Sequence, residues 1–269
     1  MTRAKNLPSL LDKMWMDYVA INPMAKKIYD LFIQDGETVL NDHIALRTFN
    51  HPRVTVDVLA KPFIDSGYKY CGDYHFHEKK LYAKHYQHPD LTLPKIFISE
   101  LKLEEFSPAF QKAVHQLIDQ VPEGMEHEFD FVSAGRPWKV TTQIYNDLLK
   151  ETDYAAWVSA FGYRPNHFTV SINGLKKMTD IHALNTYLKA QGFKLNGSGG
   201  EVKGSKEVYL EQSSTLANNI EVKFDDATLM IPACYYEFAK RYPMKNGELY
   251  QGFVAASADK IFESTSRGQ

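Results

Sequence analysis

Two histidines and one glutamate carry the chemistry that this sequence predicts. His43 and His167 each stand near the start of a strand-like run, and Glu237 lies in an aromatic, otherwise apolar stretch. An ionised carboxylate in such a stretch is costly unless it is paired or coordinated. Two histidines and one carboxylate with open positions form the facial triad of non-haem Fe(II) oxygenases. We therefore expect a mononuclear metal site, with Fe(II) first and Mn(II), Zn(II) or Ni(II) as alternatives.

Arg47 is the cation that the pattern places beside this site. Side chains at positions i, i+2 and i+4 of a strand share one face, so Arg47 points the same way as His43. The strand then offers one imidazole ligand and one fixed cation to the same cavity. Two other interpretations stay open at this point: Arg47 is an ordinary surface cation, and Glu237 pairs with Lys240 or Arg241 rather than with a metal.

The order of the predicted elements explains why the two histidines should meet. After helices at 8–20 and 22–35, one order of strand, helix and three strands occurs twice. The predicted elements are 43–49, 55–66, 68–75, 80–86 and 95–102 in the first unit, and 166–172, 179–191, 207–212, 219–224 and 228–238 in the second. Thr179 is the expected N-cap of the second unit's helix. Pseudo-twofold pairing of the units would bring their first strands together, and with them the two histidines.

These elements predict an α+β protein that forms a single compact domain. Ser107 and Pro108 mark a helix start before 110–120, and 138–162 has the pattern of one or two further helices. The expected divisions are N-terminal helices (1–40), a first βαβββ module (41–105), a helical insertion (106–163), a second βαβββ module (164–245) and a C-terminal tail (246–269).

Glu100 is a second carboxylate that bears on the site. It lies in the last strand of the first unit, and we interpret it as the positional counterpart of Glu237. Coordination by Glu100 would give two histidines and two glutamates, as in glyoxalase-like isomerases. Otherwise Glu100 hydrogen-bonds a ligand or pairs with Arg47, and we expect it in this catalytic position next to the metal ligands.

A separate group of histidines lies in the next strands of the first unit. It comprises His75, His77, His85 and His88. No carboxylate or cysteine motif with zinc-ligand spacing accompanies them. A solvated pair of strands is therefore the favoured interpretation, with a zinc site as the alternative.

The composition excludes several classes of protein. The chain has 269 residues, 44% hydrophobic and 24% charged, with a net charge of −2. This charge argues against a general nucleic-acid or anionic-membrane surface. No run of 18 apolar residues exists, so we expect no membrane span, and the N-terminal stretch is typical of an amphipathic helix rather than a signal peptide. The two cysteines, far apart in sequence, favour a cytoplasmic location. Phosphate-binding loops and nucleophile elbows are missing from the sequence.

Several motifs together give the chain a resemblance to a known family. In order and spacing they resemble the 2-oxoadipate dioxygenase/decarboxylase family, also called the 2-hydroxyglutarate synthases, over residues 40 to 245. The motifs are HIALR (43–47), FISEL (97–101), NHF (166–168), EQSST (211–215) and IPACYYEF (231–238). The resemblance implies a vicinal-oxygen-chelate-like half-open barrel around one Fe(II), with the ligands at His43, His167 and Glu237.

The resemblance also implies an activity. A small 2-oxo acid and O2 would give a hydroxylated product and CO2; for 2-oxoadipate the product would be 2-hydroxyglutarate, in lysine degradation. Arg47 would bind the substrate carboxylate, and Ser213 and Ser214 would add hydrogen bonds. The enzyme would be a monomer or a homodimer with no nucleic-acid or membrane partner. The best-known members are considerably longer, so this chain is expected to lack segments that help to close their pocket.

Two rival functions are compatible with the same residues. The first is a glyoxalase-like lyase, isomerase or hydrolase that uses Zn(II) or Ni(II), with Glu100 as fourth ligand or general base. The second is a non-catalytic module that binds a metal or a small molecule, because a fold by itself does not fix a function.

Overall fold

One curled β-sheet forms the centre of the protein. The computed structural model describes residues 6–265, and within them eight strands form a sheet in the order β2-β3-β4-β1-β5-β10-β7-β6. The strands are β1 (Asn41–Phe49), β2 (Lys69–Phe76), β3 (Leu81–Gln87), β4 (Lys95–Leu101), β5 (Pro165–Ser171), β6 (Lys203–Ser205), β7 (Leu210–Ser214) and β10 (Tyr235–Arg241). A separate hairpin pairs β8 (Asn219–Lys223) with β9 (Thr228–Pro232).

The sheet consists of two halves that repeat one arrangement. In one half β1 runs parallel to β4, and in the other β5 runs parallel to β10. The halves join where β1 pairs antiparallel with β5. The α+β class and the curled half-barrel are therefore confirmed, and the first strands of the two repeats are direct neighbours, as the pattern of the sequence predicts.

Helices lie on both faces of the sheet: all but the last are on its convex face or beyond its ends. They are α1 (Leu7–Ile21), α2 (Pro23–Gln34), α3 (Val56–Asp65), α4 (Pro108–Ile118), α5 (Thr142–Glu151), α6 (Asp153–Phe161), α7 (Ile181–Ala190) and α8 (Ala255–Phe262). The hydroxyl groups of Thr55 and Ser107 cap α3 and α4, as polar residues before apolar periodic runs predict. The N-cap of α7 is Asp180, not Thr179, because the Asp180 side chain accepts from the Ala183 amide.

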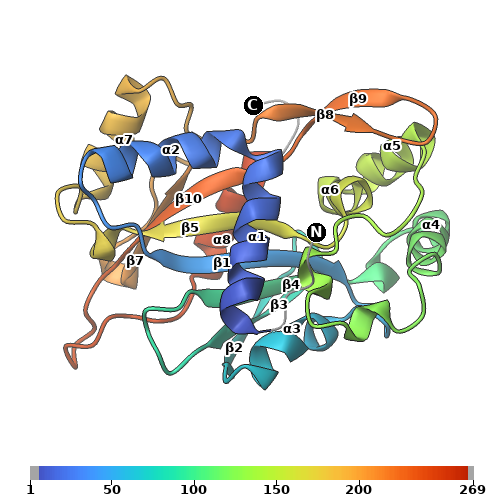
Figure 1. The fold of residues 1–269 in the computed structure, drawn as a ribbon, viewed down its shortest axis with the longest axis horizontal. Helices are drawn as coiled ribbons and strands as arrows, with labels where there is room; N and C mark the ends of the chain where they lie inside the picture. Colours follow the sequence, from blue (N-terminus) through green and yellow to red (C-terminus); the bar gives the residue numbers. More distant parts are fainter. Residues whose placement is uncertain (1–5, 266–269) are drawn as a thin grey trace.

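The outer face of the sheet packs an aromatic core against α1 and α2. Helix α1 crosses in front of the strands in Figure 1, and the ring of Trp15 lies 5.1 Å from that of Phe168, in an edge-to-face contact. Tyr18 and Tyr236 are fully buried in the same layer. Each buried aromatic side chain contributes roughly 1.5–3 kcal/mol through the hydrophobic effect. Because side chains alternate along a strand, the residues between these aromatics point to the opposite, concave face.

Two parts of the chain differ from the sequence prediction. The stretch 228–238, predicted as one strand, is two strands in different sheets, because the chain turns after Pro232 and the Ala233 amide donates to the carbonyl of Asn218. The predicted C-terminal tail contains α8, which packs against β6 and β7 and also against β2 at the other end of the sheet. In Figure 1, α8 lies behind the sheet, on the side opposite α1. It therefore spans the open side of the half-barrel.

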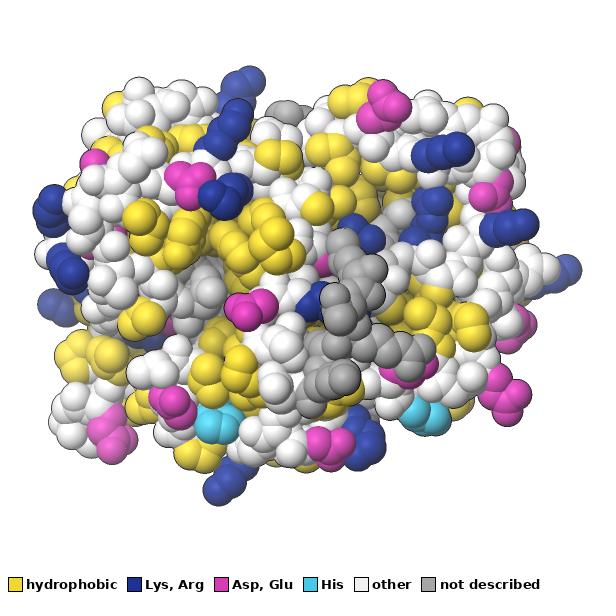
Figure 2. Space-filling model, viewed as in Figure 1, with side chains coloured by type: hydrophobic (Ala, Val, Ile, Leu, Met, Phe, Trp, Pro, Cys, Tyr) yellow, Lys and Arg dark blue, Asp and Glu magenta, His cyan; other side chains and the backbone are white. Residues whose placement is uncertain are grey.

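The surface over α1 and α2 has no single sign of charge. Figure 2 shows Lys and Arg side chains interspersed with Asp and Glu side chains over this face, with hydrophobic groups between them. Among the described residues, no helix is both long and apolar enough to cross a membrane.

Candidate metal centre

Three neighbouring strands bring the predicted ligands together on the concave face. Across β1, β5 and β10, His43 is in register with Thr169, and Thr169 with Glu237. His167 lies two residues before Thr169 and so points to the same side. One possible ligand atom from each of His43, His167 and Glu237 lies within 4.8 Å of the others, and all three side chains are buried. No other such group occurs in the part of the chain that the structure describes.

Each histidine is oriented by the residue that precedes it. The Nδ1 atom of His43 lies 2.9 Å from Oδ1 of Asp42, and Nδ1 of His167 lies 3.1 Å from Oδ1 of Asn166. Both partners are acceptors, so each imidazole donates from Nδ1 and keeps the lone pair on Nε2. Such bonds fix the tautomer and ring orientation of metal-ligating histidines. The two Nε2 atoms face Glu237, at 3.5 Å from Oε1 for His43 and 3.3 Å from Oε2 for His167.

The electrostatics of the site favour a neutral His167 imidazole beside a buried carboxylate. Burial, and then the charges of His43 and Arg47, hold the pKa of His167 well below its usual range. Burial also raises the pKa of Glu237, although His43 and a hydrogen bond from Gln212 oppose this shift. A buried carboxylate of this kind is destabilised as an anion unless a positive charge is supplied.

The carboxylate of Glu237 has one oxygen available to coordinate a metal ion. Gln212 Nε2 donates to Oε1 at 2.6 Å, whereas Oε2 is buried and has no hydrogen-bond partner among the described residues. One nitrogen of each imidazole and one carboxylate oxygen lie within 4.8 Å of one another, and the Thr169 hydroxyl lies 3.1 Å from Nε2 of His43. Nitrogen and carboxylate ligands of this number suit a divalent transition metal and leave further coordination positions open. The residues therefore fit a metal ion.

Glu100 does not lie next to the metal ligands, contrary to the prediction. In the paired strands, His43 is opposite Lys95 just as His167 is opposite Tyr235, so the counterpart of Glu237 is Phe97 and not Glu100. Glu100 alternates with Ser99 and faces the other side of β4, where it accepts from the Val56 amide at the start of α3. The counterpart position thus holds a phenyl ring, which cannot coordinate a metal.

Arg47 is buried and lies on the same face as His43, but it lines a different cavity. Its guanidinium carbon lies 4.9 Å from the ring centre of Tyr154 and 5.2 Å from that of Trp157, both on α6 of the helical insertion. The adjoining cavity of about 320 Å³ is bordered by α6 and by residues 78–81. In this structure Arg47 and the metal ligands border separate cavities, so the shared cavity stays a prediction; the charge of Arg47 nevertheless contributes to the lowered pKa of His167.

The two predicted serines point in opposite directions. Ser214 is in register with Glu237 and bonds Ser264, whereas Ser213 faces outward and donates to Asn185 on α7. Ser213 is thus wrong as a substrate-binding residue. Gln212, which the sequence prediction missed, shares the inner face with Ser214. The alternation along EQSST contains the signal that could have found it.

The four histidines of the first unit are separated. His85 is buried on the concave face, and its Nδ1 lies 3.0 Å from the hydroxyl of Tyr74. The rings of His75 and His77 stack with their centres 6.1 Å apart, outside the concave face. His88 lies beside Tyr68. The zinc site is therefore not formed, and the solvated strand pair describes His75 and His77 but not His85.

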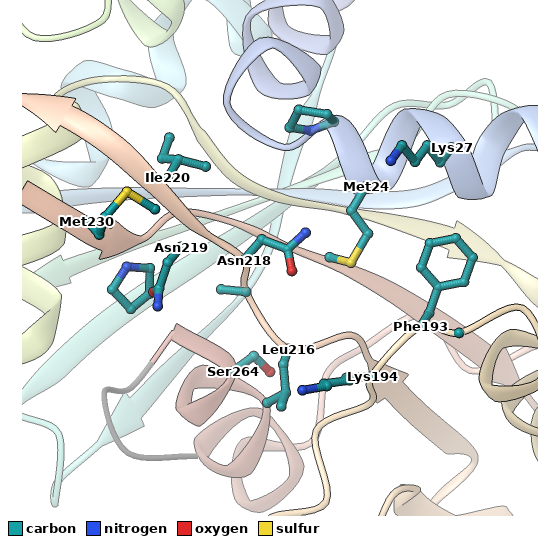
Figure 3. A pocket seen from close by; sticks show the side chains of 14 residues that line it. Met24, Lys27, Phe193, Lys194, Leu216, Asn218, Asn219, Ile220, Met230 and Ser264 are labelled. Carbon is teal, nitrogen blue, oxygen red and sulfur yellow. The ribbon is translucent and has the colours of Figure 1, made fainter.

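The cavity at the metal ligands is small. It measures about 20 Å³, and the C-terminal residues Phe253 and Ile261 form part of its wall together with Phe97. A cavity of about 800 Å³ lies elsewhere, between Met24 and Lys27 of α2 and Ile220 and Met230 of the β8–β9 hairpin (Figure 3). Its lining contains no histidine, cysteine or carboxylate. Chemistry, rather than cavity size, therefore identifies the site.

Fold and site together define a class of structure, a curled sheet of two repeated halves with a candidate metal-ligand group at their junction. A protein from Ralstonia eutropha that is described as a glyoxalase superfamily protein shares this fold, with a TM-score of 0.79 at 20% identity, over 91% of this chain and 84% of that one. Within this class, the model of the 2-oxoadipate dioxygenase/decarboxylase family matches residues 13–130 and 126–251. The chain belongs to this family.

Individual relatives agree with this assignment. The chain is 34% identical to the chloroplastic 2-oxoadipate dioxygenase/decarboxylase of Arabidopsis thaliana, over 97% of this chain and 78% of that protein. It superimposes on the hydroxyglutarate synthase of Oryza sativa, determined in complex with 2-oxoadipate, with a TM-score of 0.91 and 34% identity, covering 99% of this chain and 96% of that one. A Shewanella frigidimarina protein described as a hydrolase is 53% identical, with a TM-score of 0.90, over 95% of this chain and 100% of that one. The chain spans 96% of the Oryza structure but 60% of the Pseudomonas putida hydroxyglutarate synthase structure, so longer relatives exist as expected, and the lack of pocket-closing segments stays a prediction.

Proposed function

We propose that this chain is a metal-dependent dioxygenase that decarboxylates a small 2-oxo acid, with 2-oxoadipate as the first candidate. The observation that carries the proposal is the buried group of His43, His167 and Glu237, whose possible ligand atoms lie close together in a member of this family. In the overall reaction, 2-oxoadipate and O2 give 2-hydroxyglutarate and CO2, which balances without a second organic substrate.

In this proposal the three residues hold Fe(II). Fe(II) bound there would supply O2 activation and would take the carboxylate and keto oxygens of the 2-oxo acid. Asp42 and Asn166 keep the two imidazoles oriented, and the Gln212 amide holds Oε1 of Glu237. The rings of Phe97 and Phe253 border the site and exclude water from it.

Arg47 would bind the far carboxylate of a dicarboxylic substrate. Its side chain leaves the same strand as His43, four residues further along, and a strand rises about 3.3 Å per residue, so the two Cα atoms are roughly 13 Å apart. This spacing leaves room between a metal and a guanidinium for a short diacid. A guanidinium binds a carboxylate through two parallel hydrogen bonds, which a lysine cannot reproduce.

The first test is oxygen uptake. Protein loaded anaerobically with Fe(II) and mixed with 2-oxoadipate should consume O2 and release CO2 in equal amounts when air is admitted. Arg47→Lys should raise KM for 2-oxoadipate more than 10-fold and change pyruvate turnover less. Iron-loaded protein that takes up no O2 with any 2-oxo acid would contradict the proposal.

The glyoxalase-like alternative lacks the ligand that it needs. Its fourth ligand or base was to be Glu100, and this residue caps α3 on the other face of β4. Phe97 occupies the counterpart of Glu237. We therefore favour iron over Zn(II) or Ni(II), because three protein ligands leave positions for both the 2-oxo acid and O2.

The cysteines and the named relatives bear on the cellular setting. Cys71 is exposed and Cys234 is buried, and both are free thiols, which supports a reducing compartment such as the cytoplasm. The Arabidopsis relative is named chloroplastic. With 2-oxoadipate as substrate the reaction would serve lysine degradation. A monomer or a homodimer, without a nucleic-acid or membrane partner, remains the proposed state.

A further inference from the structure

A short segment near the C-terminus crosses the mouth of the metal site. We call residues 250–253 the strap. The Tyr250 side chain folds closely over the bend at Gly252, where a Cβ would lie 2.5 Å from the Tyr250 hydroxyl. The strap ends in Phe253, whose ring stands edge-to-face at 4.8 Å from the ring of His43 and lies 5.0 Å from that of Phe97. The strap therefore places an aromatic side chain directly against a proposed ligand.

One guanidinium joins the strap to that ligand. Arg241 Nη1 donates to the carbonyls of Tyr250 and Gly252, at 3.0 and 2.8 Å. Its Nε and Nη2 donate to the two oxygens of Asp42, at 2.6 and 2.9 Å. Asp42 in turn accepts from Nδ1 of His43 at 2.9 Å. The contacts run without a break from the strap through Arg241 and Asp42 to His43, and all three of these side chains are buried.

The other half of the sheet holds the strap from its opposite side. The Phe253 amide donates to the hydroxyl of Tyr74 on β2 at 3.1 Å, and Nε2 of Gln87 on β3 donates to the carbonyl of Gln251 at 3.1 Å. The strap is thus bonded to both halves of the half-barrel. It rests over their junction, where the metal ligands lie.

The closed strap leaves too little space for a substrate. The cavity beside His43, His167 and Glu237 is about 20 Å³, which holds about one water molecule. A six-carbon diacid is several times larger. Phe253 must therefore move before such a molecule can reach the ligands.

We propose that Arg241 is a positioning residue that couples closure of the strap to the orientation of His43, and that the strap is the gate of the site. This inference rests on the proposed metal site. When the strap is closed, its two carbonyls fix the Arg241 guanidinium, which fixes Asp42 and through it the His43 imidazole. When a metal holds His43 in place, the same contacts favour the closed strap, because such coupling is reciprocal.

The test compares two arginines with the same chemistry. Arg53 also makes a two-point pair with one carboxylate, that of Glu126, and also donates to backbone carbonyls, at 118, 121 and 122, but has no link to the ligands. Mn(II) affinity by competition with a chelating dye, and hydrogen exchange of residues 250–253 with and without Mn(II), would be measured for Arg241→Gln and Arg53→Gln. We expect Arg241→Gln to lower Mn(II) affinity about 10- to 100-fold, as for other partners of metal-bound histidines. Exchange in the strap should rise and lose its response to Mn(II).

The outcomes separate the two proposals. Arg53→Gln should keep Mn(II) affinity within about twofold of the wild type, even if both variants lose thermal stability. If Arg241→Gln does not fold, Arg241→Lys replaces it: an ammonium cannot make all four contacts, so a smaller loss of affinity in the same direction is expected. Wild-type affinity and wild-type strap exchange in the folded Arg241 variant would overturn the inference alone. A wild-type protein that binds no Mn(II) or Fe(II) would overturn the proposed function itself.

Discussion

The two halves of the sheet use one scaffold for different tasks. Each half presents a histidine whose Nδ1 is held by the residue before it, Asp42 in the first half and Asn166 in the second. At the next equivalent position, however, the first half has Phe97 and the second has Glu237. The repeat therefore supplies two imidazoles symmetrically but only one carboxylate.

This asymmetry separates the site from a two-histidine, two-glutamate centre. A second glutamate at 97 would fill a position that O2 or the 2-oxo acid needs. The phenyl ring instead keeps that side apolar and dry. The open coordination positions therefore result from one difference between the two repeats, Phe97 in place of a glutamate, and not from a different fold.

The largest expected effect comes from making the halves alike. Phe97→Glu should restore the missing carboxylate opposite Glu237 and give a four-ligand site. We expect Zn(II) and Ni(II) to bind at least as tightly as in the wild type, and O2 uptake with 2-oxoadipate to fall more than 100-fold. Phe97→Leu is the control, because it alters the shape without adding a ligand. Equal O2 uptake in Phe97→Glu and Phe97→Leu would contradict the claim that a carboxylate at position 97 fills a coordination position that the reaction needs.

A second expected effect concerns the buried histidine of the first half. His85 is in register with Phe97 as Ser214 is with Glu237, so a histidine stands where the second half has a serine. Burial, and then the charges of Arg241 and Lys95, lower the pKa of His85 to about 4. A histidine with a lowered pKa contributes stability that is present above its unfolded value near 6.5 and is lost as the pH falls toward 4.

Acid unfolding therefore measures what the buried His85 of the first half contributes to stability. Between pH 6.5 and pH 4, the Tm of the metal-free wild type should fall more steeply than that of His85→Gln. His75→Gln serves as the control, since His75 lies outside the concave face and should leave the slope unchanged. Parallel slopes for the wild type and His85→Gln would show that His85 is not held neutral by its surroundings.

The smallest expected effect on the metal site comes from Glu100, whose position the sequence prediction gave wrongly. Glu100→Ala should leave metal affinity within about twofold, because Glu100 faces away from the ligands. Loss of its bond to the Val56 amide should destabilise the protein by about 1 kcal/mol, the usual value for a helix cap. Chemical denaturation and a metal titration of the same sample measure both. Loss of metal from this variant would show that Glu100 contributes to metal binding.

Strand alternation made part of the site predictable. The parity of β1 placed His43 and Arg47 on one face, and the matching order of elements placed His167 beside them. The prediction for Glu100 was wrong because Glu100 was matched to Glu237 by its place near a strand end. In the observed register His43 is opposite Lys95, so the equivalent of Glu237 is Phe97, two residues after Lys95. An error of one residue in parity moves a side chain to the other face.

Other features had no local signal. The run 228–238 is apolar throughout, so its periodicity cannot show the turn after Pro232 that separates β9 from β10. The helix α8 is eight residues long, and its packing across the open sheet depends on tertiary contacts alone. Nor does sequence spacing reveal that Arg241 pairs with Asp42, 199 positions away, rather than with Glu237.

The iron content of the isosteric variant Glu237→Gln tests the central claim most directly. Equilibrium dialysis against Fe(II) under anaerobic conditions should give one iron per chain for the wild type and none for Glu237→Gln. The metal-free variant should unfold at a temperature no lower than the metal-free wild type, because burial raises the pKa of Glu237 and its ionised form opposes folding. A folded Glu237→Gln protein that retains one iron per chain would contradict the account.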